Sequence, residues 1–68
     1  MKYPEVKSEM KHKKITLAMI ASDPRVDCTV STLSQKLNGK YLLTFGEAVA
    51  IKAILQSELP LEDLFREG

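Results

Sequence analysis

The chain has 68 residues and a mass of 7.6 kDa, so we treat residues 1–68 as one small domain. A domain of this size buries too little surface for an extended catalytic cleft. Its apolar content of 44% is that of a folded protein and too high for a disordered tail. No apolar run is long enough to span a bilayer and the N-terminus lacks the apolar core of a signal peptide, so we expect a cytoplasmic protein without membrane contact.

The net charge of +1 is unevenly distributed along the chain. Residues 1–40 hold eight basic residues against four acidic ones, whereas residues 41–68 hold two against five. The first part of the chain therefore suits a polyanionic partner, and the second part would repel one. Solvated helix faces are the alternative explanation of the same pattern.

An amphipathic pattern predicts a first helix over residues 3–13, with its lysines facing outward. Its apolar positions recur at helical spacing: Tyr3, Val6 and Met10. Thr16 is a good N-cap for a second, short helix over residues 17–22. Asp23-Pro24 then ends that helix, because the residue before a proline avoids the helical conformation.

A third helix follows, capped by either Asp27 or Thr29. It places Leu33 and Leu37 inward, four residues apart on the same face. The dipeptide at 38–39, Asn-Gly, ends it, because both residues tolerate the left-handed conformation of a helix C-cap.

Thr44 and Glu47 have the spacing of a capping box and predict the start of a fourth helix. The predicted buried stripe of that helix consists of Phe45, Ala48, Ile51 and Leu55. One or two further helical turns, entered through Pro60, fold back on the core through Leu61, Leu64 and Phe65. No segment alternates as a β-strand does, so the predicted fold is an all-α bundle of four to five short helices.

The residue types needed for common catalytic and metal sites are scarce. His12 is the sole histidine and stands among lysines, so the chain lacks a zinc cluster and a nucleophile–histidine set. Cys28 is the sole cysteine, and we interpret it as a small buried apolar residue rather than a reactive thiol. We therefore expect no enzyme activity, no metal and no cofactor.

The helices expected at residues 16–22 and 29–37 have the spacing of a helix-turn-helix, whose second helix enters the DNA major groove. The segments "TVSTLSQKLNGK", "LTFGEAVAIK" and "LPLEDLF" resemble the small helix-turn-helix regulators of temperate phages and Gram-positive bacteria, the XRE-like Cro and lambda-repressor superfamily. The resemblance runs from about Val6 to Phe65. It implies a lambda-repressor-like domain with a central helix-turn-helix, and a Cro-like transcriptional repressor of a phage or prophage that binds double-stranded operator DNA.

Short hydroxyl and amide side chains can approach base edges closely, whereas Lys and Glu on a helix mainly provide solubility. The family pattern implies that four residues face bases: Thr29, Val30, Ser31 and Gln35. It assigns five others to the DNA backbone, where they set the register: Thr16, Ser34, Lys36, Asn38 and Lys40. Gln35 would pair with adenine through two hydrogen bonds, and the methyl groups of Val30 would contact a thymine methyl.

The chain departs from the family pattern between its two central helices. The connection "SDPRVDC" is longer than the usual tight turn and contains a proline, and Leu17 and Met19 stand where polar or charged residues are common. We expect the longer turn to cover these two side chains. The alternative is a protein-binding surface, as in an antirepressor of the same fold that docks onto a partner repressor.

Three apolar residues of the expected fourth helix need a cover of their own: Ala50, Ala53 and Ile54. Either the last helical turn or a twofold-related partner provides it. A homodimer on DNA is the favoured expectation, because helix-turn-helix proteins usually bind paired half-sites.

Overall fold

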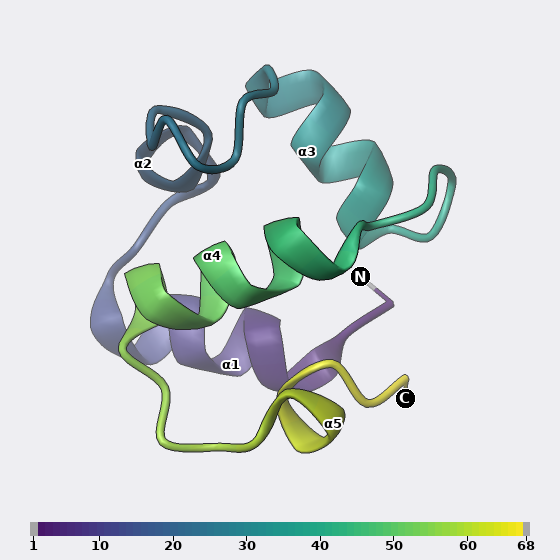
Figure 1. The fold of residues 1–68 in the computed structure, drawn as a ribbon. Coiled ribbons are helices and arrows are strands. Elements are labelled where there is room, and N and C mark those ends of the chain that lie inside the picture. Colours follow the sequence, from purple (N-terminus) through teal and green to yellow (C-terminus); the bar gives the residue numbers. More distant parts are fainter. Residues whose placement is uncertain (1, 68) are drawn as a thin grey trace.

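The computed structural model describes residues 2–67, which are all-α without any strand. The five helices are α1 (Pro4–Lys13), α2 (Leu17–Ala21), α3 (Val30–Leu37), α4 (Phe45–Leu55) and α5 (Leu61–Leu64). In Figure 1, α4 crosses the middle of the molecule, with α1 and α5 on one side of it and α2 and α3 on the other. The all-α fold with five short helices confirms the predicted fold class. None of these helices combines the length and apolar character needed to cross a membrane.

One apolar core joins the five helices. Its buried members are Val6, Met10, Ile20, Val26, Leu33, Leu37, Ala50, Ile51, Leu55 and Leu64. The predicted inward positions of α3 are confirmed, because Leu33 and Leu37 have no exposed surface. Burial of such a side chain stabilises the fold by roughly 1.5–3 kcal/mol, so these two residues hold α3 onto the domain.

The buried face predicted for α4 is confirmed at Ile51 and Leu55 but not in the first turn of the helix. Phe45 is 75% exposed, so its place in the buried stripe is wrong, and Ala48 is only partly buried. The inward positions belong to Glu47, Ile51 and Leu55, which follow one another at intervals of four residues. Phe45 precedes Glu47 by two residues, or about 200° around the helix, so the two side chains cannot both face the core.

Threonine side chains cap α2 and α3. The N–H of Met19 donates to Oγ1 of Thr16 at 3.2 Å, and the N–H of Thr32 donates to Oγ1 of Thr29 at 3.1 Å. The choice left open by the sequence is thereby decided in favour of Thr29, because Asp27 has a left-handed backbone and makes no cap. Each cap satisfies an N–H group that the helix itself cannot pair, and contributes about 1 kcal/mol.

The connection between α2 and α3, residues 22–29, contributes to the core. Val26 lies in this connection and is only 3% exposed. Leu17 is partly buried against the core, whereas Met19 remains 52% exposed. Leu17 is therefore partly covered, as expected, whereas Met19 is not.

The chain itself covers most of the apolar surface of α4. Ala50 is 3% exposed, and Ile54 is partly buried against the core. Ala53 stays exposed. Burial of Ala50 and Ile54 thus needs no partner subunit.

Candidate nucleic-acid interface

α3 presents short polar side chains on the side away from the core. Leu33 and Leu37 face inward, and at about 100° per residue Ser31 and Gln35 lie on the opposite side. Ser31 is exposed and Gln35 is partly exposed. α3 contains no Asp or Glu. This side of α3 can therefore exchange hydrogen bonds with an anionic partner without repelling it.

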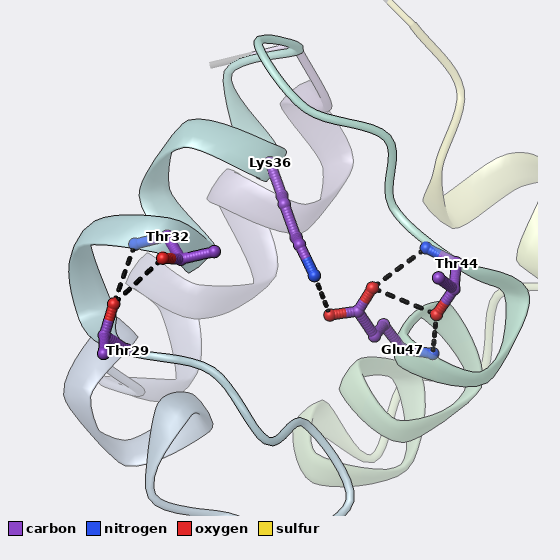
Figure 2. A network of polar contacts seen from close by, with 5 residues as sticks. All are labelled: Thr29, Thr32, Lys36, Thr44 and Glu47. Atoms are coloured by element: carbon purple, nitrogen blue, oxygen red, sulfur yellow. Dashed lines mark hydrogen bonds and ion pairs between the residues drawn. The ribbon is translucent and has the colours of Figure 1, made fainter.

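The start of α3 is held by its capping residue (Figure 2). The hydroxyl of Thr29 accepts from the N–H of Thr32 at 3.1 Å and donates to Oγ1 of the same residue at 3.0 Å. A base contact by Thr29 would therefore have to use its methyl group or the second lone pair of its oxygen. Val30 follows with 44% of its surface exposed and its methyl groups accessible to a partner.

An ion pair ties α3 to α4, as Figure 2 shows. Nζ of Lys36 donates to Oε2 of Glu47, and the two side chains are 18% and 9% exposed. Oε1 of the same carboxylate accepts from the N–H and from the hydroxyl of Thr44, each at 3.0 Å. The N–H of Glu47 donates to Oγ1 of Thr44 at 3.1 Å, which completes the predicted capping box. One carboxylate thus caps α4 and anchors the last turn of α3.

The ion pair determines the charge state of both partners. Burial alone would raise the pKa of Glu47, but the hydrogen bonds from Lys36 and Thr44 outweigh burial and hold this pKa below its ordinary value. The hydrogen bond to the carboxylate raises the pKa of Lys36. Both groups are therefore charged at neutral pH, and the pair stays intact there.

The pair changes the interpretation of Lys36. The family pattern assigns Lys36 to the DNA backbone, whereas its ammonium group here lies against Glu47. A phosphate contact would require this ion pair to open. Sequence reasoning found Glu47 as a capping residue but missed its second partner, because no helical spacing links residues 36 and 47.

The other predicted backbone contacts surround α3. Asn38 and Lys40 are exposed beyond its last turn, and Ser34 is partly buried on its flank. Thr16 is exposed at the start of α2, which packs against α3. Gly39 has a left-handed backbone with φ +87°, as predicted for the end of α3, and lets the N–H of Lys40 bond the carbonyl of Gln35 at 2.9 Å.

Arg25 is a cation in the connection that precedes α3, and sequence reasoning did not select it. Its Nε and backbone N–H donate to one carboxylate oxygen of Asp23, at 3.0 and 2.8 Å, and a terminal nitrogen donates to the other at 2.9 Å. These hydrogen bonds lower the pKa of Asp23 to about 2. The ion pair stiffens the connection and offsets the positive charge of Arg25.

Comparisons with protein-family models, curated proteins and solved structures found no match. The resemblance to helix-turn-helix regulators stays a prediction from the sequence segments that carry it. Any function proposed for the chain must therefore rest on the geometry of α3 and its surroundings.

A second surface feature lies away from α3, between α1 and the connection that follows α4. It is an open groove of about 550 Å³ whose lining includes Glu5, Glu9, His12 and Glu58. Lys13 crosses from α1 and donates to the carbonyl of Leu55 at 2.6 Å. Within residues 2–67, no group of His, Cys, Asp and Glu is placed to hold a metal ion. The carboxylates at this groove make it a poor surface for DNA.

Cys28 precedes α3 and is partly buried against the core. Burial raises the pKa of its thiol, and the positive charge of Lys36 only partly opposes this effect. A thiol with a raised pKa is a weak nucleophile at neutral pH. These features match the interpretation of Cys28 as a packing residue.

Proposed function

We propose that this protein is a sequence-specific DNA-binding transcriptional regulator, a Cro-like repressor that reads the major groove with α3. The observation that carries the proposal is the outward side of α3, where Ser31 and Gln35 offer uncharged hydrogen-bonding groups and no carboxylate occurs. An α-helix fits the major groove, where every base pair presents a distinct pattern of donors and acceptors.

The charge distribution supports binding of DNA on the α3 side of the molecule. Lys40 is exposed next to the end of α3, where it can contact phosphate. The acidic residues Glu58, Glu62 and Asp63 belong to α5 and the connection before it, across α4 from α3 (Figure 1). A polyanion that approaches from the α3 side therefore avoids most of the repulsion from the acidic C-terminal part.

The polar and apolar groups on α3 and just beyond its end have defined roles in this proposal. The amide of Gln35 pairs with adenine through two hydrogen bonds, and the hydroxyl of Ser31 can donate or accept. The methyl groups of Val30 contact a thymine methyl. Asn38 and Lys40 bind phosphate oxygens and set the register. Since α3 is already held by its cap and the ion pair, little ordering of the protein opposes binding.

The test begins with selection of duplexes from a random-sequence library by the purified full chain, followed by fluorescence anisotropy titration at two salt concentrations. We expect binding that resists competitor DNA and weakens steeply with salt, because lysine contacts displace counterions. Gln35→Ala should cost about 1–3 kcal/mol on the selected duplex and relax preference at one base pair. Lys40→Ala should weaken binding to all duplexes alike.

Two matched variants control for indirect effects. Ser8→Ala and Lys7→Ala change exposed residues on α1, across α4 from α3, and should leave affinity nearly unchanged. Selection that yields no preferred sequence, or a Gln35→Ala variant that binds the selected duplex as tightly as wild type, would contradict the assignment of α3 as the reading helix.

A second candidate function is a protein-binding module that docks onto a partner repressor. The exposed side chain of Met19 on α2 favours it, because α2 would otherwise lie across DNA with an apolar residue outward. In that case the chain would not retard DNA at low salt. It would instead form a complex with a partner repressor, and Met19→Ser would disrupt that complex while Lys7→Ala would not.

A further inference from the structure

The segment that precedes α1 lies against the end of α3. The N–H of Lys2 donates to the carbonyl of Leu37, the last residue of α3, at 2.9 Å. In Figure 1 this segment runs from the start of α1 towards the end of α3. The hydrogen bond satisfies one of the carbonyl groups that a helix cannot pair within its own last turn. Lys2 is therefore held at the same end of α3 as the proposed phosphate contacts.

The side chain of Lys2 packs on Gly39. A Cβ atom added to Gly39 would lie only 2.8 Å from Cδ of Lys2 and 3.7 Å from its Cγ and Cε. Gly39 stands between Asn38 and Lys40, which are exposed and are the residues proposed to bind phosphate. The stem of Lys2 thus contacts the short segment that would lie along the DNA backbone.

A carboxylate occupies the ammonium group of Lys2. Nζ of Lys2 forms an ion pair with Oε1 of Glu67 at 2.8 Å, and the two side chains are 36% and 60% exposed. The hydrogen bond to Glu67 raises the pKa of Lys2, so this group is charged at neutral pH. The rings of Tyr3 and Phe65 meet edge to face with centroids 5.3 Å apart, which holds the segments before α1 and after α5 together. An acidic residue that follows α5 therefore reaches the end of α3.

We propose that Lys2 is a further residue that binds the DNA backbone, and that Glu67 occupies its ammonium group until a phosphate displaces it. This inference rests on the proposed DNA-binding function. A carboxylate and a phosphate are both anionic hydrogen-bond acceptors, so they compete for the same ammonium group. Because backbone contacts carry no sequence information, Glu67 lowers the affinity for all duplexes alike.

Exposure distinguishes this ion pair from the one between Lys36 and Glu47. The side chains of Lys36 and Glu47 are 18% and 9% exposed, and opening that pair would leave a buried carboxylate without its cation. Glu67 is solvated when it releases Lys2, and an exposed ion pair contributes little to stability. DNA carries one negative charge per about 1.7 Å of its axis and releases counterions when a lysine binds, which favours phosphate in the exchange. Lys2 can therefore change partners more readily than Lys36.

Fluorescence anisotropy titrations of the full chain with the selected duplex, at several salt concentrations, test the proposal. Glu67→Gln removes the competing charge, so the dissociation constant should fall about two- to fivefold, which corresponds to the strength of an exposed ion pair. Glu62→Gln is the matched control. Glu62 is exposed on α5 and forms no ion pair within residues 2–67, so its loss of the same charge should leave the dissociation constant nearly unchanged.

Lys2→Ala removes the ammonium group but keeps the N–H that donates to Leu37. It should weaken binding to all duplexes and reduce the slope of log affinity against log salt concentration by about 1. Lys7→Ala, which removes an exposed lysine of α1, should leave this slope unchanged. In the double variant Lys2→Ala/Glu67→Gln, the gain in affinity from Glu67→Gln should vanish, because Glu67 acts through Lys2. Thermal unfolding should show that all variants remain folded, since the pair is exposed.

An unchanged salt slope in Lys2→Ala would overturn the proposal. It would also be overturned if Glu67→Gln tightened binding no more than Glu62→Gln, or tightened it equally without Lys2. Any of these results, with Gln35→Ala still weakening binding to the selected duplex, would refute this inference and leave the proposed function in place. Binding without sequence preference that still responded to Glu67→Gln only when Lys2 is present would refute sequence-specific regulation alone. A chain that binds no DNA would refute both.

Discussion

The Lys36–Glu47 ion pair allows the anchoring of α3 to be measured. Lys36→Met removes the ammonium group and keeps an apolar stem of similar length, so the carboxylate of Glu47 loses its only cationic partner among the described residues. Removing one partner of a fully buried pair costs about 3–5 kcal/mol. Two hydrogen bonds from Thr44 remain, and the side chain of Lys36 is 18% exposed. We therefore expect the free energy of unfolding to fall by about 2 kcal/mol.

A double-mutant cycle isolates the contribution of the pair itself. Denaturant unfolding followed by circular dichroism would be measured for wild type, Lys36→Met, Glu47→Gln and the double variant. We expect a coupling energy of about 1–2 kcal/mol, since groups in one polar network are not additive. A coupling below about 0.5 kcal/mol would refute the reasoning, because the pair would then behave like an exposed surface ion pair.

The pH dependence provides an independent check on the same pair. The folded-state pKa of Glu47 lies below its ordinary value, so its contribution is fully present above about pH 4.3 and is lost as the pH falls through the folded-state pKa. In Lys36→Met this contribution is already missing. The stability difference between wild type and variant should therefore shrink below about pH 4. A difference that stays constant down to pH 3, on the order of one unit below the ordinary pKa, would show that Glu47 is not its source.

Two further substitutions test how α3 begins and ends. Thr29→Ala should lower the free energy of unfolding by about 1 kcal/mol, and Thr29→Ser should restore most of it, because only the hydroxyl makes the cap; equal stability of all three proteins in denaturant unfolding would argue against a cap. Gly39→Ala should cost about 1–2 kcal/mol, since φ is +87° and a Cβ would lie 2.8 Å from Cδ of Lys2. The same cost in a Lys2→Ala background would identify the backbone as its main source, whereas its disappearance there would identify the side-chain clash.

Local sequence signals were sufficient where an element depends on its own residues. Gly39 and the Thr44–Glu47 capping box act within one or two turns of chain, and the structure has them as predicted. Thr29 was one of two caps offered for α3, and the structure selects it. Leu33 and Leu37 were found for a similar reason. Apart from Val30 in the first turn, the rest of α3 is polar, so only one apolar side was available to face the core.

Local signals failed where contacts between distant residues decide the outcome. The buried stripe predicted for α4 was right at Ile51 and Leu55 but wrong at Phe45, because apolar residues occupy both sides of this helix. The buried position of the first turn belongs instead to Glu47, which pairs with Lys36, and Phe45 lies about 200° away around the helix. The same ion pair occupies the ammonium group of Lys36, which was predicted to contact the DNA backbone. Spacing along a helix carries no information about a pair that joins two helices.

The predicted base-contacting residues were assigned by resemblance. In the structure, two of them do not contribute to the stability of the fold. The side chains of Ser31 and Gln35 make no hydrogen bond to any other described residue, and the core and the ion pair hold α3 without them. Substitutions there should alter binding while leaving the fold intact.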